Sequence, residues 1–265
     1  MLFRSGRGGS GGGAGGGLGR LDVALDRVQV TDTIALARFE GLFDGARGAL
    51  AGRFSARVGG REAVAGQAIP QNGGVALRLT GGDAGDILEA AGLLDNVQDG
   101  TFALDLAPVA GAAGQYDGLL SIEGARLRGA PAIAALLDAV SVVGLIDQLN
   151  GPGIYFSEVE ARFRLTPDRV ILSRGSAVGP SMGISMDGYY GLQSRRMDLQ
   201  GVLSPVYLLN GIGRLIARKG EGLIGFNFNL RGTRGAPDVS VNPLSVFTPG
   251  MFRDIFRRPP PTLSD

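Results

Sequence analysis

Apolar and polar residues alternate with period two along much of the chain after residue 20. In six segments an apolar side chain or glycine stands at every second position, and mainly polar residues stand between them. The six segments are residues 50–59, 75–80, 101–106, 158–165, 196–203 and 224–231. Successive side chains of a β-strand point to opposite faces, so each segment predicts a strand with one apolar and one polar face. This pattern is typical of an antiparallel sheet that is solvated on one side.

Clusters of glycine, proline, asparagine and aspartate separate these segments. They are Gly59-Gly60, Asn72-Gly73-Gly74, Asp99-Gly100, Thr166-Pro167-Asp168 and Asp187-Gly188. Residues of these types favour tight hairpin turns. We therefore expect a mainly β fold, with a long, curved antiparallel meander sheet and an apolar inner face, rather than alternating strands and helices.

Four segments with helical periodicity interrupt the predicted meander, so we expect three or four short to medium helices covering part of the sheet. They are Asp83–Ala91, Pro131–Leu149, Pro205–Arg218 and Thr248–Arg257. Only Pro131–Leu149 has about the length that a ~30 Å hydrocarbon core requires. Asp138 and Asp147 would be costly inside a bilayer, so we interpret this segment as a helix packed on the apolar face.

The composition excludes several common chemistries. The chain of 265 residues has no Cys, His or Trp. Without His or Cys there is no Ser-His-Asp triad, no cysteine nucleophile and no zinc site of the usual ligands. The formal net charge of +1 gives no reason to expect nucleic acid as a partner. We expect neither a metal nor a cofactor.

Two carboxylate pairs and one glycine-rich stretch have simple structural interpretations. Asp83 and Asp86 stand at a predicted helix start, where negative charge is favourable, and Glu158 and Glu160 share a wet strand face with arginines. Residues 8–17 are rich in glycine but lack the Gly-Lys-Ser/Thr ending of a phosphate loop. We therefore expect no enzymatic activity.

The chain divides into three parts by composition. Residues 1–20 form a Gly/Ser-rich flexible segment without the apolar region of a secretory signal, residues 21–258 form one β-domain, and residues 259–265 form a Pro-rich tail. An opening inside such a linker indicates a fragment of a longer protein.

The continuous apolar face needs either a cover or an apolar ligand. The helices are too short to cover a whole sheet, so we predict a groove for acyl chains. The candidate groove residues are Leu77, Leu79, Phe102, Leu104, Phe163, Met182, Met197, Leu199, Phe226 and Phe228. Packing in the core is the alternative role of each.

The end of the last predicted helix combines aromatic and basic residues, as a membrane-interface anchor does. These candidates are Phe252, Arg253, Phe256, Arg257 and Arg258. A terminal helix docked on the end of the sheet is the alternative.

Seven short stretches, in this order, resemble the C-terminal region of AsmA-like envelope proteins of Gram-negative bacteria, of the YhdP type. They are GAPAIAALL (129–137), SVVGL (141–145), GIYF (153–156), GPSMG (179–183), GVLSPVYLLN (201–210), VNPLS (241–245) and TPGMFR (248–253). The resemblance covers residues 21–258. It implies a periplasmic segment of an inner-membrane-anchored protein, whose anchor is absent from this chain, and a β-groove that takes part in phospholipid transfer between the inner and outer membranes.

The partners implied are a phospholipid or another acyl lipid, together with a membrane surface or envelope proteins. A second hypothesis is a TamB-like assembly module, in which a sheet edge takes up a partner strand. A third is a β-helix or adhesin-like surface protein, which the lack of a fixed repeat period weakens.

Overall fold

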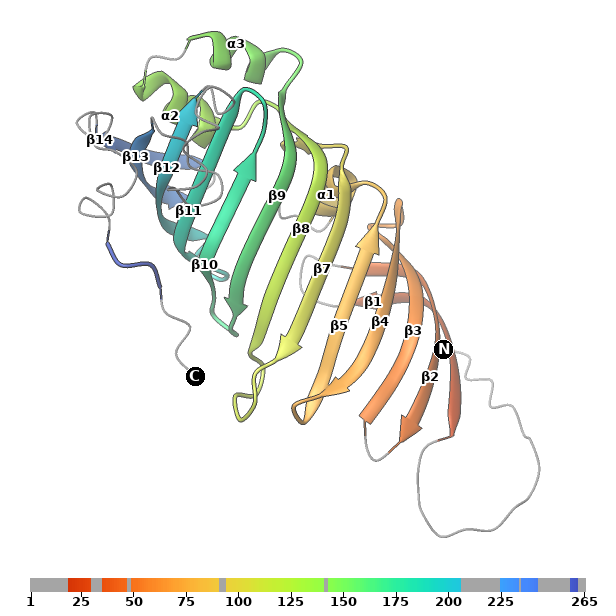
Figure 1. Cartoon of the computed structure of the whole chain (residues 1–265). Helices are drawn as coiled ribbons and strands as arrows, with labels where there is room; N and C mark the ends of the chain where they lie inside the picture. Colours follow the sequence, from red (N-terminus) through yellow and green to blue (C-terminus); the bar gives the residue numbers. More distant parts are fainter. Residues whose placement is uncertain are drawn as a thin grey trace, which may run out of the picture.

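The chain folds into one open antiparallel sheet (Figure 1). The computed structural model describes residues 19–29, 35–46, 49–90, 94–140, 143–205, 225–233, 235–242 and 258–261. Its strands are β1 (Arg20–Gln29), β2 (Ala35–Ala46), β3 (Ala49–Val58), β4 (Glu62–Gln71), β5 (Gly74–Gly81), β6 (Val97–Gln98), β7 (Thr101–Pro108), β8 (Tyr116–Leu127), β9 (Ile154–Leu165), β10 (Arg169–Val178), β11 (Met182–Gly191), β12 (Arg196–Pro205), β13 (Phe226–Thr233) and β14 (Ala236–Asn242).

The strands lie in the sheet in the order in which they occur in the sequence. The path runs β1-β2-β3-β4-β5-β7-β8-β9-β10-β11-β12-β13-β14, and the short β6 pairs with the far end of β8. All pairs are antiparallel, and the sheet formed by the described strands is not closed. The predicted fold class, a mainly β meander with a few short helices, is therefore confirmed.

Two groups of helices pack on the sheet. Helix α1 (Ala84–Ala90) follows β5, and helices α2 (Pro131–Ala139) and α3 (Val143–Asn150) connect β8 to β9. Ile87 and Leu88 of α1 pack into a cluster with Phe102 and Ile122, which we call the α1 cluster. The helices α2 and α3 contribute Leu136, Leu137, Leu145 and Leu149 to a second cluster, the α2–α3 cluster, together with Ile154, Met182, Leu203 and Phe228.

The predicted helix over Pro131–Leu149 is wrong as a single element. The segment forms two helices: α2 ends at Ala139, directly before Val140, and α3 begins at Val143. Valine is β-branched and loses side-chain freedom in a helix, so a valine at each of these boundaries disfavours one continuous helix. Among the described residues, no helix has the length and apolarity to span a bilayer. The helix predicted over Asp83–Ala91 is observed as α1, which begins at Ala84. Residues 206–218 and 248–257, which carry the other two predicted helices, lie outside the described residues.

Two of the predicted hairpin turns are wrong. Asp187-Gly188 lies inside β11, where a Cβ on Gly188 would overlap the backbone of Asp198 and Leu199. Close approach of β12 therefore accounts for this glycine. Asp99-Gly100 joins β6 to β7, which do not pair with each other, and its carbonyl oxygens accept hydrogen bonds from the first amides of α1.

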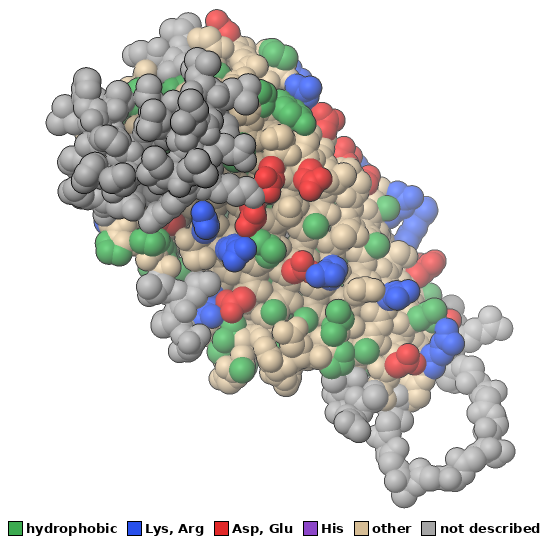
Figure 2. Space-filling model, viewed as in Figure 1, with side chains coloured by type: hydrophobic (Ala, Val, Ile, Leu, Met, Phe, Trp, Pro, Cys, Tyr) green, Lys and Arg blue, Asp and Glu red, His purple; other side chains and the backbone are tan. Residues whose placement is uncertain are grey.

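One face of the sheet, which we call the polar face, carries most of the charged side chains. A row of cross-strand partners on it from β1 to β9 is Asp22, Leu42, Arg53, Gln67, Arg78, Asp105, Leu119 and Arg162. Arg78 pairs with Asp105, and Arg164 donates to Asp117 at 2.8 Å. Figure 2 shows acidic and basic side chains interspersed over the face in view. Opposite charges on adjacent strands attract, as at Arg78–Asp105 and Arg164–Asp117, which supports the register.

Candidate functional site: the apolar face

The register of the strands aligns apolar residues into a row that crosses the whole sheet. We call it the first apolar row. Its members are Leu21, Phe43, Gly52, Ala68, Leu77, Leu106, Gly118, Phe163, Leu172, Gly188, Leu199, Leu230 and Val239, one from each strand of the path. No member has a polar side chain.

A second apolar row runs beside the first, two residues further along each strand, or three at the irregular step in β10. Its members are Val23, Gly41, Phe54, Gly66, Leu79, Leu104, Leu120, Ala161, Gly175, Met186, Gly201, Phe228 and Val241. This row also contains no polar side chain. The two rows together form an apolar face that spans every strand of the path from β1 to β14, on the side opposite the polar face.

Phenylalanine and glycine are paired across strands within these rows. Phe43 faces Gly52, Phe54 faces Gly66, Phe163 faces Gly118 and Phe228 faces Gly201. In each pair the phenyl ring lies over the glycine, so that a Cβ there would overlap the ring. The rings of Phe39, Phe43 and Phe54 also stack, with centroids 5.1 to 6.4 Å apart. Because rings fill the space above glycines, this part of the apolar face is smooth.

The two helix clusters include only part of the apolar face. Leu79, Leu104 and Leu120 pack against the α1 cluster, and Met186, Leu199 and Val241 pack against the α2–α3 cluster. In the part of the chain that the structure describes, the larger side chains of the first apolar row between β1 and β10 belong to neither cluster. We call these residues the uncovered strip: Leu21, Phe43, Leu77, Leu106, Phe163 and Leu172. Leu21 is exposed, and the other five are half-buried.

The dimensions of the uncovered strip suit a long apolar ligand. It crosses nine strands of the path, and eight inter-strand spacings of about 4.8 Å give a length of about 38 Å. This exceeds the ~30 Å thickness of the hydrocarbon core of a bilayer. Each 100 Å² of apolar surface that a ligand removes from water contributes about 2.5 kcal/mol, at about 25 cal/mol per Å².

The ten residues proposed from the sequence divide between strip and core. Leu77 and Phe163 lie in the uncovered strip, and Phe226 is half-buried at the start of β13. Leu79 and Leu104 are half-buried beside the α1 cluster, and Met197 and Leu199 beside the α2–α3 cluster. Phe102, Met182 and Phe228 are core residues that are 7, 0 and 3 % exposed. A charge at Phe228 would therefore test folding rather than ligand binding.

Sequence reasoning missed several members of the strip. Phe43, Leu106 and Leu172 were not among the proposed groove residues, although Leu106 belongs to an alternating segment. The signal that identifies them is the pairing register, because only the register brings Leu77, Leu106 and Phe163 into one row around Gly118.

Of the proposed membrane-interface residues, Phe252, Arg253, Phe256 and Arg257 lie outside the described residues. Arg258 is described, and its guanidinium group donates to Asp198 on the polar face at 2.8 and 3.1 Å. The side chain of Arg258 is therefore engaged with the sheet.

Comparisons of the chain with protein-family models, with curated proteins and with solved structures find no match. The apolar rows and the uncovered strip are thus the features of the molecule that point to a function.

Proposed function

We propose that the uncovered strip binds lipid acyl chains, and that the protein takes part, without enzymatic activity, in phospholipid transfer between the inner and outer membranes of a Gram-negative envelope. The observation that carries this proposal is the uninterrupted first apolar row. A single charged or strongly polar side chain in that row would oppose the passage of a hydrocarbon chain. Thirteen consecutive strand positions contain none.

The arrangement of the two faces supports a chain-like ligand with a polar end. Acyl chains would lie on the uncovered strip, perpendicular to the strands, and the head groups would stay in water at its border. The strip is longer than a single acyl chain, because half of a ~30 Å hydrocarbon core already accommodates one. It would therefore hold more than one chain along its length. The resemblance to AsmA-like proteins adds the periplasm as the compartment and the two membranes as source and destination.

The test compares two adjacent residues of β10 that point to opposite faces. Leu172 belongs to the uncovered strip, and its neighbour Ile171 lies on the polar face, with both side chains partly buried. We would express the full chain with a periplasmic signal in a Gram-negative host and measure co-purified lipid by native mass spectrometry. We expect phospholipid with the unchanged protein and with Ile171→Asp, and at least a tenfold loss with Leu172→Asp.

A second pair repeats the comparison at the other end of the strip. Phe43 lies in the uncovered strip and Leu42, 46 % exposed, lies on the polar face of the same strand. Circular dichroism must show the same β content in all four variants. Lipid-free unchanged protein, or equal lipid loss in both members of each pair, would refute the proposal.

The β1 edge favours a second candidate function, the uptake of a partner strand. Strand β1 pairs with β2 along one edge, and no described strand pairs with its other edge. An edge strand of ten residues is long enough to accept an added strand. A folded, lipid-free protein that captures an extended peptide through β1 would favour this function over lipid binding.

A further inference from the structure

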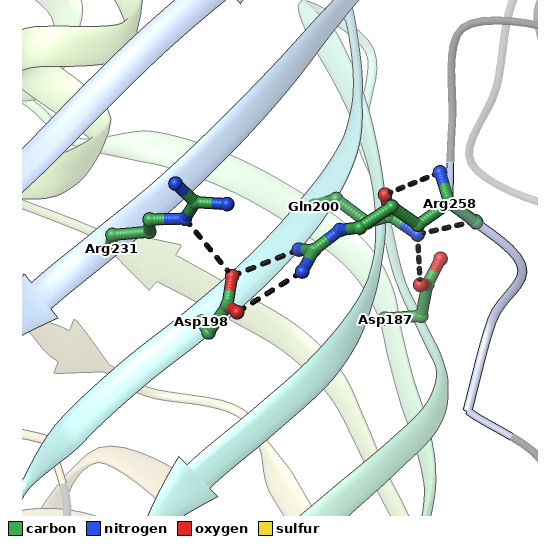
Figure 3. Close-up of polar contacts among 5 residues, drawn as sticks. All are labelled: Asp187, Asp198, Gln200, Arg231 and Arg258. Carbon is green, nitrogen blue, oxygen red and sulfur yellow. Dashed lines mark hydrogen bonds and ion pairs between the residues drawn. The ribbon is translucent and has the colours of Figure 1, made fainter.

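The polar face of β11 to β13 holds a segment that is distant in the sequence. Gln200 of β12 forms two hydrogen bonds with the backbone of Arg258 (Figure 3). The amide N–H of Arg258 donates to Oε1 of Gln200 at 3.0 Å, and Nε2 of Gln200 donates to the carbonyl oxygen of Arg258 at 2.7 Å. A side-chain amide thus satisfies both backbone groups of one residue, as a neighbouring strand would.

A third contact fixes the orientation of the Gln200 amide. Nε2 of Gln200 also donates to Oδ1 of Asp187, its direct cross-strand partner, at 2.8 Å. A flipped amide would turn its oxygen toward the Asp187 carboxylate and its NH₂ toward the Arg258 N–H, so both contacts would be lost. Gln200 and Asp187 are only 4 and 3 % exposed. These two residues are therefore a prearranged receptor for a peptide group.

The side chain of the captured residue has its own receptor. Two guanidinium nitrogens of Arg258 donate to the two carboxylate oxygens of Asp198, at 2.8 and 3.1 Å. Arg231, the cross-strand partner of Asp198, donates to the same carboxylate at 3.3 Å. This fork recognises arginine by shape as well as by charge, which a lysine ammonium group does not reproduce.

The three prolines after Arg258 suit a segment that binds the sheet through the backbone of a single residue. Pro259, Pro260 and Pro261 have no backbone N–H groups, so they cannot extend the pairing as a strand. Proline runs favour an extended polyproline conformation that loses little entropy on binding. Arginine followed by prolines therefore presents one peptide group and one guanidinium group from a stiff backbone.

We propose that Asp187, Asp198 and Gln200 form a peptide-binding site for an extended arginine–proline segment, and that residues 258–261 of the same chain are its ligand. The site is separate from the uncovered strip, because it lies on the polar face. Residues 243–257 connect β14 to this site, so the ligand is tethered to the sheet that binds it. A tethered ligand has an effective concentration of the order of millimolar, which keeps the site filled.

The test empties the site in the full chain and then offers the ligand from outside. Arg258→Asp places a second carboxylate against Asp198, which should release the tail. A labelled synthetic peptide of residues 256–265 is then titrated by fluorescence anisotropy. We expect saturable binding to the Arg258→Asp protein, at least tenfold weaker binding to the unchanged protein, and at least tenfold weaker binding to the Arg258→Asp protein that also carries Gln200→Ala.

Two control peptides separate recognition from general charge attraction. A peptide with Arg258→Gln should lose binding at least tenfold, and so should one with Arg258→Lys, which keeps the charge but not the planar fork. Binding that Arg258→Lys leaves unchanged, or that survives Gln200→Ala, would overturn the proposal. So would an amide of Arg258 that exchanges with solvent, in the NMR spectrum of the unchanged protein, as fast as that of an unstructured peptide.

Discussion

At the scale of single residues, two of the phenylalanine–glycine pairs give expectations of different size for the same substitution, glycine to alanine. A Cβ on Gly201 would meet the ring of Phe228 and the carbonyl oxygen of Ser185. Phe228 is 3 % exposed, so its ring has no space into which to move. We expect Gly201→Ala to lower the free energy of unfolding by about 3 kcal/mol, the upper range for overpacking.

Gly118 and Gly144 are the matched controls for that substitution. The three atoms nearest to a Cβ on Gly118 all belong to the ring of Phe163, which is half-buried in the uncovered strip and has room to shift. We expect Gly118→Ala to cost less than about 1 kcal/mol. Gly144 of α3 has no neighbour within 4 Å of such a Cβ, so its change to Ala should stabilise by about 0.5–1 kcal/mol. Urea unfolding followed by circular dichroism measures all three, and equal losses at Gly201 and Gly118 would contradict these expectations.

The carboxylate of Asp198 gives a pH dependence with a defined direction. Its pKa lies below the ordinary Asp value, because the hydrogen bonds from Arg258 stabilise the charged form more than partial burial opposes it. The contribution of this group to stability is thus complete above the ordinary Asp pKa of about 3.9 and is lost as the pH falls through the lower pKa of the folded state. We expect an NMR titration of Arg258→Gln to show the pKa of Asp198 closer to the ordinary value. An unchanged midpoint would mean that the fork is not formed in solution.

At the scale of elements, the side chain of Asp83 caps the start of α1, beside the backbone carbonyls of Asp99 and Gly100. Oδ1 of Asp83 accepts a hydrogen bond from the amide of Asp86 at 3.0 Å, at the start of a helix of seven residues. Ala84, Ile87 and Leu88 of this helix are buried in the α1 cluster. We expect Asp83→Ala to destabilise the protein by about 1 kcal/mol and Asp83→Asn to change its stability by about a few tenths of that. Thermal unfolding of both variants checks this, and equal losses would indicate a role other than capping.

The observed elements also show which sequence patterns were sufficient to predict a strand, a helix end or a turn. Alternation along residues 158–165 and 196–203 predicted β9 and β12, because strict alternation over such a length is typical of a strand and does not match the period of a helix. The helix boundary near residue 140 was missed because a long apolar run hides a local weakness in helix propensity. Gly188 was misread as a turn residue, because a glycine needed for close approach of a neighbouring strand has the same local sequence as one needed for a hairpin.

At the scale of the whole molecule, the fold class followed from the pattern, whereas the candidate site did not. Meander order is the simplest arrangement of consecutive hairpins, so local turns largely dictate it. The apolar rows depend on the register of every strand pair. That register includes the irregular steps between Leu172 and Gly175 and between Ala37 and Glu40. A displacement of one residue in a single strand would turn its apolar side chains to the polar face.

The open sheet gives a prediction for local stability. Among the described strands β1 has one neighbour, β2, and most side chains of β1 are exposed. Strands β8 and β9 lie in the middle of the sheet beside both helix clusters. We expect amide hydrogens of β8 and β9 to exchange at least about a hundredfold more slowly than those of β1, as measured by hydrogen-exchange mass spectrometry. Uniform protection along the path would indicate a single cooperative unit instead.

The meander order has a consequence for how such a molecule changes in evolution. Among the strands that the structure describes, each long strand pairs with the strands before and after it along the path, and β8 also pairs with the short β6. A duplicated hairpin inserted at either edge would therefore leave every existing contact in place, as an added unit does in a repeat protein. Each additional strand would lengthen both apolar rows by about 4.8 Å. The length of the apolar face can thus change in evolution by the addition or loss of hairpins, without a change in any existing residue.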